Sequence, residues 1–471
     1  MDRKEERLST YKKEILDTKS ASFCGAKWYN ATIWLGNGMT TSCHHPPAHK
    51  VPLEELELSY KALHNTKHKK AMRKMMQEGK RPPECDYCWK LEDMGEDTVS
   101  DRVFKSIIYK DEDLQKAFET DWQEDIELKT LEIAFDNTCN LACSYCNPSF
   151  STVWVNDIKS KGHYKLISDG GAAFMQDGSW VRPYESDEDN PYIQAFWKWW
   201  DDSLSKTLTE LRLTGGEPLL NQNTWKLLDW FVDSKSSMRF AINSNLMVDD
   251  KKIDKLIEQG KHVKKFKIYT SCEATGKQAE YIRHNLDYEH WTKNMYRLLT
   301  DLKVGLHIMM TINSLCLFSI TDFLDDVYKM KETVGSKNPT VSLNLLRFPS
   351  FQSPLALPDH IKDHLHEKLS SWYEINKDKK FWSGFEKASI ERLIDYLVTV
   401  DAPHRRTSNK IVLWRDFKLF YEQYDKRRNK SISVFPKILT DWIKTIPDTD
   451  FSDAELAKKE GWQFKPKPEN M

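Results

Sequence analysis

Residues 130–347 carry two alternating patterns of apolar positions. Helical spacing runs from Trp225 to Val232, from Ile253 to a stop at Gly260, from Trp291 to Leu302, and from Phe323 to Met330 before Gly335. Between these helices lie short segments rich in β-branched or large apolar residues, typical of strands. The predicted strands are TLEIAFD (130–136), LTELRLT (208–214), MRFAIN (238–243), KKFKIYTS (264–271), KVGLHIMMTI (303–312) and TVSLNLLR (340–347). This alternation predicts an α/β protein of parallel βα units, and six units suggest a partial (βα)6 or open barrel.

The length of 471 residues predicts more than one domain, because single cores seldom exceed about 300 residues. We expect segments at 1–128, 129–350 and 351–471, the last mainly helical. A long insertion at 147–206 separates the first two strands, and its part up to ESDEDN (185–190) looks disordered. The aromatic run WKWW (197–200) is expected to pack in the core, with a substrate groove as the alternative.

Charge and hydropathy narrow the class of protein. Lys plus Arg total 70 against 71 Asp plus Glu, so the chain has no overall attraction to nucleic acid or to anionic membranes. The charged start and the lack of an apolar run of about 20 residues predict a soluble, cytoplasmic protein that does not insert into a membrane. Cytosolic thiols are kept reduced, so clustered cysteines among the nine point to metal binding rather than disulfides.

Three cysteines follow the first strand at a spacing suited to an iron–sulfur cluster. Cys139, Cys143 and Cys146 form C-x3-C-x2-C on one loop. Three thiolates can bind three irons of a 4Fe-4S cubane and leave the fourth iron open, whereas structural zinc needs four ligands and no further Cys or His lies nearby in sequence.

This spacing, with Tyr145 before the last cysteine, resembles the radical S-adenosylmethionine (radical SAM) signature. In that family the open iron chelates the methionine end of SAM, and by this likeness Tyr145 is expected to lie beside the bound cofactor. The second strand ends in LTGGEP, where Gly215, Gly216 and Glu217 resemble the family's GGE motif, which binds the SAM amino group. A simple turn is the alternative for GGEP alone, but its position one βα unit after the cysteine loop favours the resemblance.

Later strand ends supply weaker matches to the same family. By likeness, Asn243 and Asn313 lie near SAM, Ser271 contacts the ribose and Arg283 binds the SAM carboxylate. Glu273 stands where many members have Asp, which leaves its role open. The alternative is that these polar residues cap strand ends and turns, and it applies to Asn243, Ser271, Arg283 and Asn313.

A second set of cysteines lies near the N-terminus: Cys24, Cys43, Cys85 and Cys88. The spacing C-x13-G-x4-C through Gly38, followed by C-x2-C, resembles the twitch (half-SPASM) module, which binds an auxiliary 4Fe-4S cluster. Here the module precedes the core, as in the N-terminal-twitch group, and the resemblance covers about residues 20–350. The alternative is a zinc ribbon, for which His44, His45 or His49 are further candidate ligands.

The resemblance implies an iron–sulfur oxidoreductase or transferase that cleaves SAM to a 5′-deoxyadenosyl radical, with an electron donor such as flavodoxin or ferredoxin. Its known relatives modify peptides and proteins or oxidise sugar alcohols, and modification of a peptide or protein is the leading hypothesis.

Dehydrogenation or epimerisation of a small sugar or polyol is the second hypothesis. For this reaction Cys272 and Cys316 are candidate hydrogen donors, with buried structural thiols as the alternative. A non-catalytic iron–sulfur or zinc protein is the third; a nucleic-acid partner is not expected, because acids beside the basic segment 425–430 favour a solvated helix face.

Overall fold

All six predicted strands are present in the computed structural model, which describes residues 3–95, 98–167, 173–174, 178, 181, 183–398 and 410–447. The described residues form a mostly parallel nine-stranded sheet in the order β11-β10-β8-β7-β6-β4-β1-β2-β3. Its strands are β1 (Asn30–Trp34), β2 (Met39–Thr41), β3 (His49–Lys50), β4 (Thr130–Ala134), β6 (Glu210–Thr214), β7 (Arg239–Asn243), β8 (Phe266–Thr270), β10 (Gly305–Ile312) and β11 (Thr340–Leu345). The chain is therefore an α/β protein, and its parallel strands agree with the predicted barrel-like core.

Contacts divide the chain into two compact units. Unit 1 comprises 1–137, 180–242 and 263–265, and unit 2 comprises 138–179, 243–262 and 266–471. These units cut across the segments 1–128, 129–350 and 351–471, which stay predictions.

Unit 1 contains three strands that the apolar pattern did not predict. β1 pairs in parallel with β4, and β2 and β3 continue from β1 as antiparallel neighbours. The hairpin between β1 and β2 turns at Gly38, where φ is +68° and the ring of Tyr192 leaves no room for a Cβ. The sheet of unit 1 therefore begins inside the N-terminal cysteine region.

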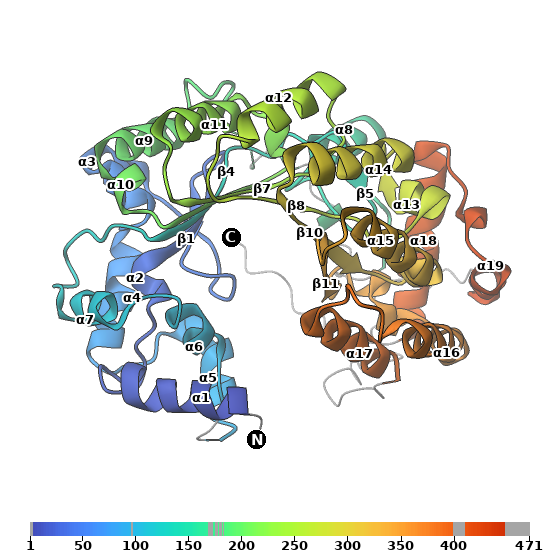
Figure 1. Ribbon diagram of the computed structural model, residues 1–471, viewed down its shortest axis with the longest axis horizontal. Coiled ribbons are helices and arrows are strands. Elements are labelled where there is room, and N and C mark those ends of the chain that lie inside the picture. The colour runs from blue at the N-terminus through green and yellow to red at the C-terminus, as the bar shows by residue number, and fades with distance from the viewer. Residues whose placement is uncertain are drawn as a thin grey trace. The chain divides into compact units, whose positions relative to one another are not determined.

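Among the helices of unit 1, α9 (Pro191–Trp199) and α11 (Gln222–Ser234) lie side by side in Figure 1. The rings of Trp200, the first residue of η6, and Trp230 of α11 pack with their centroids 4.9 Å apart. Trp199 and Trp200 are buried, as the core interpretation of WKWW predicts, and Trp197 is half-buried. Asn190, at the end of ESDEDN, caps α9 by accepting from two backbone N–H groups, so this end of the insertion is ordered. The helices are α1 (Arg3–Tyr11), η1 (Lys12–Leu16), α2 (Ala26–Tyr29), α3 (Leu53–Leu58), η2 (Tyr60–Leu63), α4 (Lys67–Gln77), η3 (Pro83–Cys85), α5 (Asp86–Glu92), α6 (Asp101–Ser106), α7 (Asp111–Glu119), α9 (Pro191–Trp199), η6 (Trp200–Leu204), α10 (Ser205–Thr207), η7 (Pro218–Leu220) and α11 (Gln222–Ser234).

Unit 2 alternates strands and helices and then becomes helical, as the pattern after residue 350 predicts. α12 ends at Gly260, and α15 ends at Val334, followed by Gly335, whose φ of +64° forms a left-handed cap. A two-stranded sheet, β5 (Ala142–Cys143) with β9 (Arg283–His284), lies apart from the main sheet. The helices are α8 (Thr152–Lys161), α12 (Asp250–Gly260), α13 (Gly276–Ile282), α14 (Tyr288–Arg297), η8 (Leu298–Leu302), η9 (Cys316–Phe318), α15 (Ile320–Val334), η10 (Ser350–Gln352), η11 (Pro354–Ala356), α16 (Asp359–Asn376), α17 (Gly384–Val398), α18 (Lys410–Arg428), η13 (Ile432–Val434) and α19 (Lys437–Thr445).

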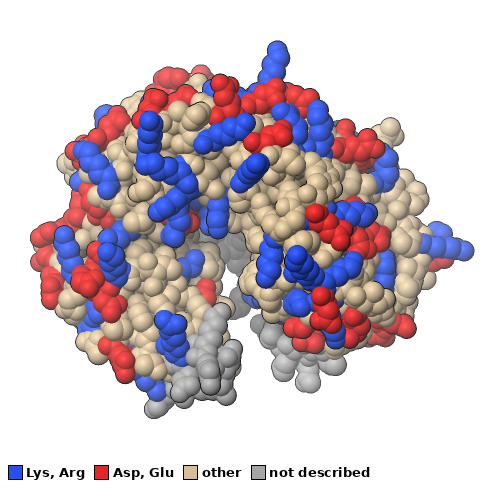
Figure 2. Space-filling view, viewed as in Figure 1, with Lys and Arg blue, Asp and Glu red and all other residues tan. Residues whose placement is uncertain are grey.

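Surface charge agrees with the balanced composition. Positive and negative side chains are interspersed over the face shown in Figure 2. Within the basic segment 425–430, Arg428 stacks over Trp154 and Tyr424 at 4.4 and 4.3 Å, and Arg427 donates to the carbonyls of Gly162 and His163. These two arginines thus pack against their own unit rather than form a solvated face. Among the described helices, none combines the length and apolar character needed to cross a bilayer.

A buried histidine makes unit 1 sensitive to acid. His64 is fully buried, and burial, with the positive charges of Lys69 and Arg73, holds its pKa well below the ordinary value of about 6.5. The unfolded chain therefore binds a proton below pH 6.5 that the folded chain excludes, so the stabilisation is complete above that pH and is lost as the pH falls below it. We expect the free energy of unfolding to fall by up to ~1.4 kcal/mol per pH unit from this group, measured by urea unfolding of the metal-free chain between pH 7.5 and 5.5. His64→Gln should reduce this pH dependence, whereas His262→Gln, at an exposed site, should not; equal slopes in both variants would contradict the assignment.

Candidate functional site

The loop at 139–144 is held by side chains at every backbone carbonyl. These donors come from α8 and its N-terminal side and from three distant segments of unit 2. The pairs are Thr152 to Cys139 O (3.1 Å), Asn285 to Asn140 O (3.0 Å), Ser151 to Leu141 O (2.6 Å), Tyr424 to Ala142 O (3.3 Å), Trp154 to Cys143 O (3.0 Å) and Gln352 to Ser144 O (3.0 Å). Because satisfied carbonyls restrict the backbone, these contacts define the course of the loop over residues 139–144.

The sulfurs of this loop receive hydrogen bonds from nearby N–H groups. Cys139 Sγ accepts from Leu141 N at 3.4 Å and from Asn245 Nδ2 at 3.7 Å, and Cys143 Sγ accepts from Arg283 Nη1 at 3.6 Å. Burial raises the pKa of Cys143, while the positive charge of Arg283 opposes that rise. Burial also raises the pKa of Cys146, and the thiols of Cys143 and Cys139 add to the effect, so the three sulfurs lie within electrostatic reach of one another. The arrangement offers three cysteine ligands, the type that holds iron–sulfur clusters as thiolates, and two of the three sulfurs accept from N–H donors.

Arg283 is fixed by a buried ion pair with Glu273. Arg283 Nη2 donates to Glu273 Oε2 at 2.6 Å, and Nε lies 3.2 Å from both carboxylate oxygens. Tyr145 donates from its hydroxyl to Glu273 at 3.1 Å, and its ring lies 5.5 Å from the guanidinium of Arg283. The structure therefore joins Tyr145, which sequence reasoning placed with SAM, to Arg283 and Glu273 in one buried network.

The other predicted positions of unit 2 differ in their contacts. Asn313 accepts from the backbone N–H groups of Leu315 and Cys316, which is the capping geometry of the alternative interpretation. Asn243, the last residue of β7, has a buried Oδ1 without a hydrogen-bond partner among the described residues, so a ligand could satisfy it. Ser271 is half-buried directly after β8.

Cys272 and Cys316 are both fully buried. Cys272 Sγ donates to Ala274 O at 3.4 Å, and Cys316 Sγ donates to Asn313 O at 3.2 Å. Burial raises the pKa of both thiols. Their contacts are those of structural thiols, and a role as hydrogen donors stays a prediction.

In unit 1 the GGEP segment folds back on the end of β4. Gly215 has φ +123°, and a Cβ there would lie 2.7 Å from Asp136 O, so only glycine fits. Gly216 N donates to the same carbonyl at 3.4 Å. Glu217 is buried, and its Oε1 accepts from Leu219 N at 3.0 Å, which caps η7. The two glycines thus bring the chain close to β4 and leave a buried carboxylate at the carboxyl end of a parallel strand, where ligands of α/β proteins bind.

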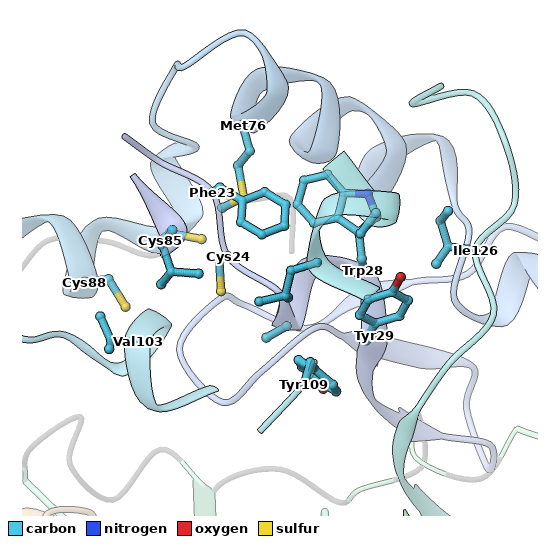
Figure 3. Close-up of a cluster of buried hydrophobic side chains, with 14 of the residues drawn as sticks. Phe23, Cys24, Trp28, Tyr29, Met76, Cys85, Cys88, Val103, Tyr109 and Ile126 are labelled. Carbon is cyan, nitrogen blue, oxygen red and sulfur yellow. The ribbon is translucent and has the colours of Figure 1, made fainter. Parts of the chain in front are cut away.

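The four N-terminal cysteines line a single cavity in unit 1. Cys24 precedes α2, Cys43 follows β2, Cys85 ends η3 and Cys88 lies in α5. Cys24, Cys85 and Cys88 belong to a buried cluster with Phe23, Trp28 and Met76 (Figure 3). Among the described residues, no three cysteine sulfurs lie within 4.8 Å of one another. A tetrahedral zinc site with Zn–S bonds of about 2.3 Å needs sulfurs about 3.8 Å apart, whereas thiolates on separate corners of a cubane lie further apart.

Basic side chains also line this cavity: Lys27, Arg102 and Lys105. Burial alone would lower the pKa of Lys27, but Cys85 and its ion-pair partner Glu84 outweigh burial and raise that pKa. Burial raises the pKa of Cys24 to about 12 and that of Cys85 to about 11, where Lys27 opposes the rise. A metal bound here would displace protons from these thiols, and the basic lining would then lie beside the resulting thiolates.

Two of the three histidines of CHHPPAH share one partner, and the third has another. Nε2 of His44 and Nε2 of His45 lie 3.1 and 2.7 Å from Asp101 Oδ2, and His45 also lines the four-cysteine cavity. His49 Nε2 bonds to Thr66 Oγ1 at 3.0 Å. His49 is therefore held in a structural contact, while His45 borders the cavity.

Sequence reasoning missed the side chains that support both cysteine sets. Trp154, Gln352 and Tyr424 hold the loop at 139–144, and Lys27 and Arg102 line the other cavity. Trp154 lies eight residues after Cys146 and could have been singled out by proximity, but Gln352 and Tyr424 are more than 200 residues away and carry no local signal.

Comparison with known proteins gives limited similarity. No protein-family model and no curated protein matches the chain. Among solved structures, the chain is similar to crystal structures of Streptococcus suis SuiB alone, bound to S-adenosylmethionine and bound to precursor peptide SuiA. Each has a TM-score of 0.31, with identities of 12%, 13% and 12%. The matches cover 65%, 73% and 74% of this chain and 62%, 68% and 70% of the SuiB chains.

Proposed function

We propose that this chain is a radical SAM enzyme that modifies a peptide or protein. The observation that carries the proposal is the three-cysteine loop, whose six carbonyls at 139–144 are all held by side chains and whose Cys143 faces a buried cation. Such a loop supports a resident cluster, because its ligands need little rearrangement on binding. A loop meant only to turn the chain would not need this many side-chain supports.

In this proposal, Cys139, Cys143 and Cys146 bind three irons of a 4Fe-4S cluster. Gly215, Gly216 and Glu217 hold the amino group of SAM, since a carboxylate beside two glycines can accept from an ammonium group at close range. Tyr145, Asn243, Ser271, Arg283 and Asn313 stay predictions for the surroundings of SAM. When bound, the cluster and SAM supply a one-electron reduction that yields methionine and a 5′-deoxyadenosyl radical able to abstract a hydrogen atom from carbon.

Cys24, Cys43, Cys85 and Cys88 are proposed to bind a second 4Fe-4S cluster. The sulfur spacing, wider than a single zinc ion requires, supports this choice over zinc. Segment 1–128 then forms the auxiliary-cluster region, 129–350 the radical SAM core and 351–471 a helical region. An external donor such as flavodoxin or ferredoxin would deliver the electrons.

Anaerobic reconstitution with iron and sulfide, followed by dithionite and SAM, tests the proposal. We expect 5′-deoxyadenosine in the absence of substrate at a low rate and a faster rate with a peptide substrate, both measured by liquid chromatography and mass spectrometry. A protein that assembles its clusters but forms no 5′-deoxyadenosine would refute the enzyme assignment. Stimulation by a small sugar or nucleotide, with none by any peptide, would refute the peptide assignment alone.

A further inference from the structure

We infer that Glu273 and Arg283 form an electrostatic positioning pair that holds a positive charge against Cys143 and so raises the reduction potential of the cluster bound there. The inference rests on the proposed function, since it concerns the same three-cysteine site. It assigns Arg283 to the cluster rather than to the SAM carboxylate, and it gives Glu273 a role that sequence comparison left open.

Backbone pairing sets the approach of Arg283 to the loop. β5 and β9 are antiparallel, with Cys143 directly opposite Arg283, and Ser144 N donates to Ile282 O at 2.7 Å. Directly opposed residues in an antiparallel pair lie within about 5.5 Å at their Cα atoms. This pairing brings the Arg283 side chain beside Cys143, and Nη1 of Arg283 lies 3.6 Å from Cys143 Sγ.

The ion pair then fixes the orientation of the guanidinium. Arg283 and Glu273 are 4% and 1% exposed, so neither charge is screened by water. Two nitrogens, Nε and Nη2, are occupied by the carboxylate, which leaves Nη1 aimed at the sulfur. Tyr145 supports the carboxylate from the other side by donating its hydroxyl. Replacing a buried ion pair by apolar side chains of similar size is often neutral or stabilising, so a contribution to stability alone does not account for this pair.

The sign of the effect follows from charge. Reduction adds an electron to the cluster, and an N–H donor and a positive charge at a ligand sulfur stabilise the more negative, reduced form. Arg283 should therefore make the potential less negative and ease reduction by the external donor. Glu273 places a negative charge near the same site and partly offsets this, so removing each partner should move the potential in opposite directions.

Redox titration followed by electron paramagnetic resonance tests the inference on the full-length protein with both clusters assembled. The signal that changes on adding SAM identifies the three-cysteine cluster, and its midpoint is then measured without SAM. We expect Arg283→Gln to shift this midpoint to more negative potential, Arg283→Lys to stay nearer the wild type, and Glu273→Gln to shift it to more positive potential. Lys331→Gln removes a buried cation from another ion pair of unit 2, Lys331–Glu386, and should leave the midpoint unchanged.

The outcomes separate a positioning role from the alternatives. Shifts of opposite sign for Arg283→Gln and Glu273→Gln support the inference, since mere loss of folding would not produce them. If single variants fail to assemble a cluster, the double variant Glu273→Gln, Arg283→Gln, which leaves no unpaired charge, is titrated instead, and a midpoint equal to the wild type overturns the inference. An unchanged midpoint with a large rise in the Kd for SAM also overturns it and returns Arg283 to the SAM carboxylate. Absence of any SAM-sensitive cluster in the wild type would instead refute the proposed function.

Discussion

Replacing Cys143 with alanine is expected to abolish assembly of the SAM-binding cluster and reduce 5′-deoxyadenosine formation to background. A cluster with one iron reserved for SAM has only three protein ligands, so losing one leaves two, too few to hold the cubane. The fold should survive, because Cys143 is half-buried and its backbone bonds to Trp154 and to β9 do not involve the sulfur. Iron content, electron paramagnetic resonance and product analysis of the anaerobic protein measure the result.

The matched control removes a cysteine of the same unit that lies outside the loop. Cys272→Ala deletes a fully buried thiol bonded to Ala274 O and should retain the iron content of the wild type. If Cys143→Ala retained all its iron and a SAM-sensitive signal, the loop would not be the cluster site. If both variants lost iron equally, general destabilisation would explain the loss.

The parallel core was predictable because each of its strands carries a local run of apolar residues that is typical of a buried strand. All six predicted strands formed within a few residues of their expected limits, since runs such as GLHIMMTI combine β-branched and large apolar residues. β1, with the sequence NATIW, was missed because it has only five residues and lies in a region that was interpreted from its cysteine spacing alone. Its pairing with β4, a hundred residues later, gives it its place in the sheet, and no local pattern encodes such a pairing.

The cysteines of both candidate sites could be singled out from the sequence, but the side chains around them could not. Spacing alone singled out both cysteine sets, and the structure gathers the four N-terminal cysteines around one cavity. The reason for Gly38 within the first spacing became visible only in three dimensions, where Tyr192 packs over the turn. Arg283 was found by likeness, but no local pattern encodes its ion pair with Glu273 or its contact with Cys143, which lies opposite it in the pair of β5 with β9. Contacts between distant segments therefore account for most of what sequence reasoning missed.

The double variant Cys85→Ala, Cys88→Ala is expected to halve the iron content of the reconstituted protein, from about eight to about four atoms per chain, because it removes two of four proposed ligands from one cluster only. The remaining iron should give the SAM-sensitive signal. Unit 1 should also become less stable, since both cysteines pack in its buried cluster and a bound cluster stabilises the folded state. Metal analysis by mass spectrometry and thermal unfolding of the reconstituted protein measure the two effects.

Cys272→Ala, Cys316→Ala is the matched double control, because it also removes two buried thiols but touches neither proposed cluster. This control should keep about eight irons.

A zinc site would give a different result: one zinc per wild-type chain, lost in the double variant Cys85→Ala, Cys88→Ala. That result would replace the second cluster by a structural zinc site and would contradict the argument from sulfur spacing. Equal iron content in the wild type and in the double variant Cys85→Ala, Cys88→Ala would mean that these cysteines hold no cluster. The basic side chains that line the cavity, Lys27, Arg102 and Lys105, would then have no cluster charge to compensate. Loss of half the iron together with an altered product, but continued SAM cleavage, would assign the second cluster to a step after hydrogen abstraction, because SAM cleavage would then proceed at the three-cysteine site without it.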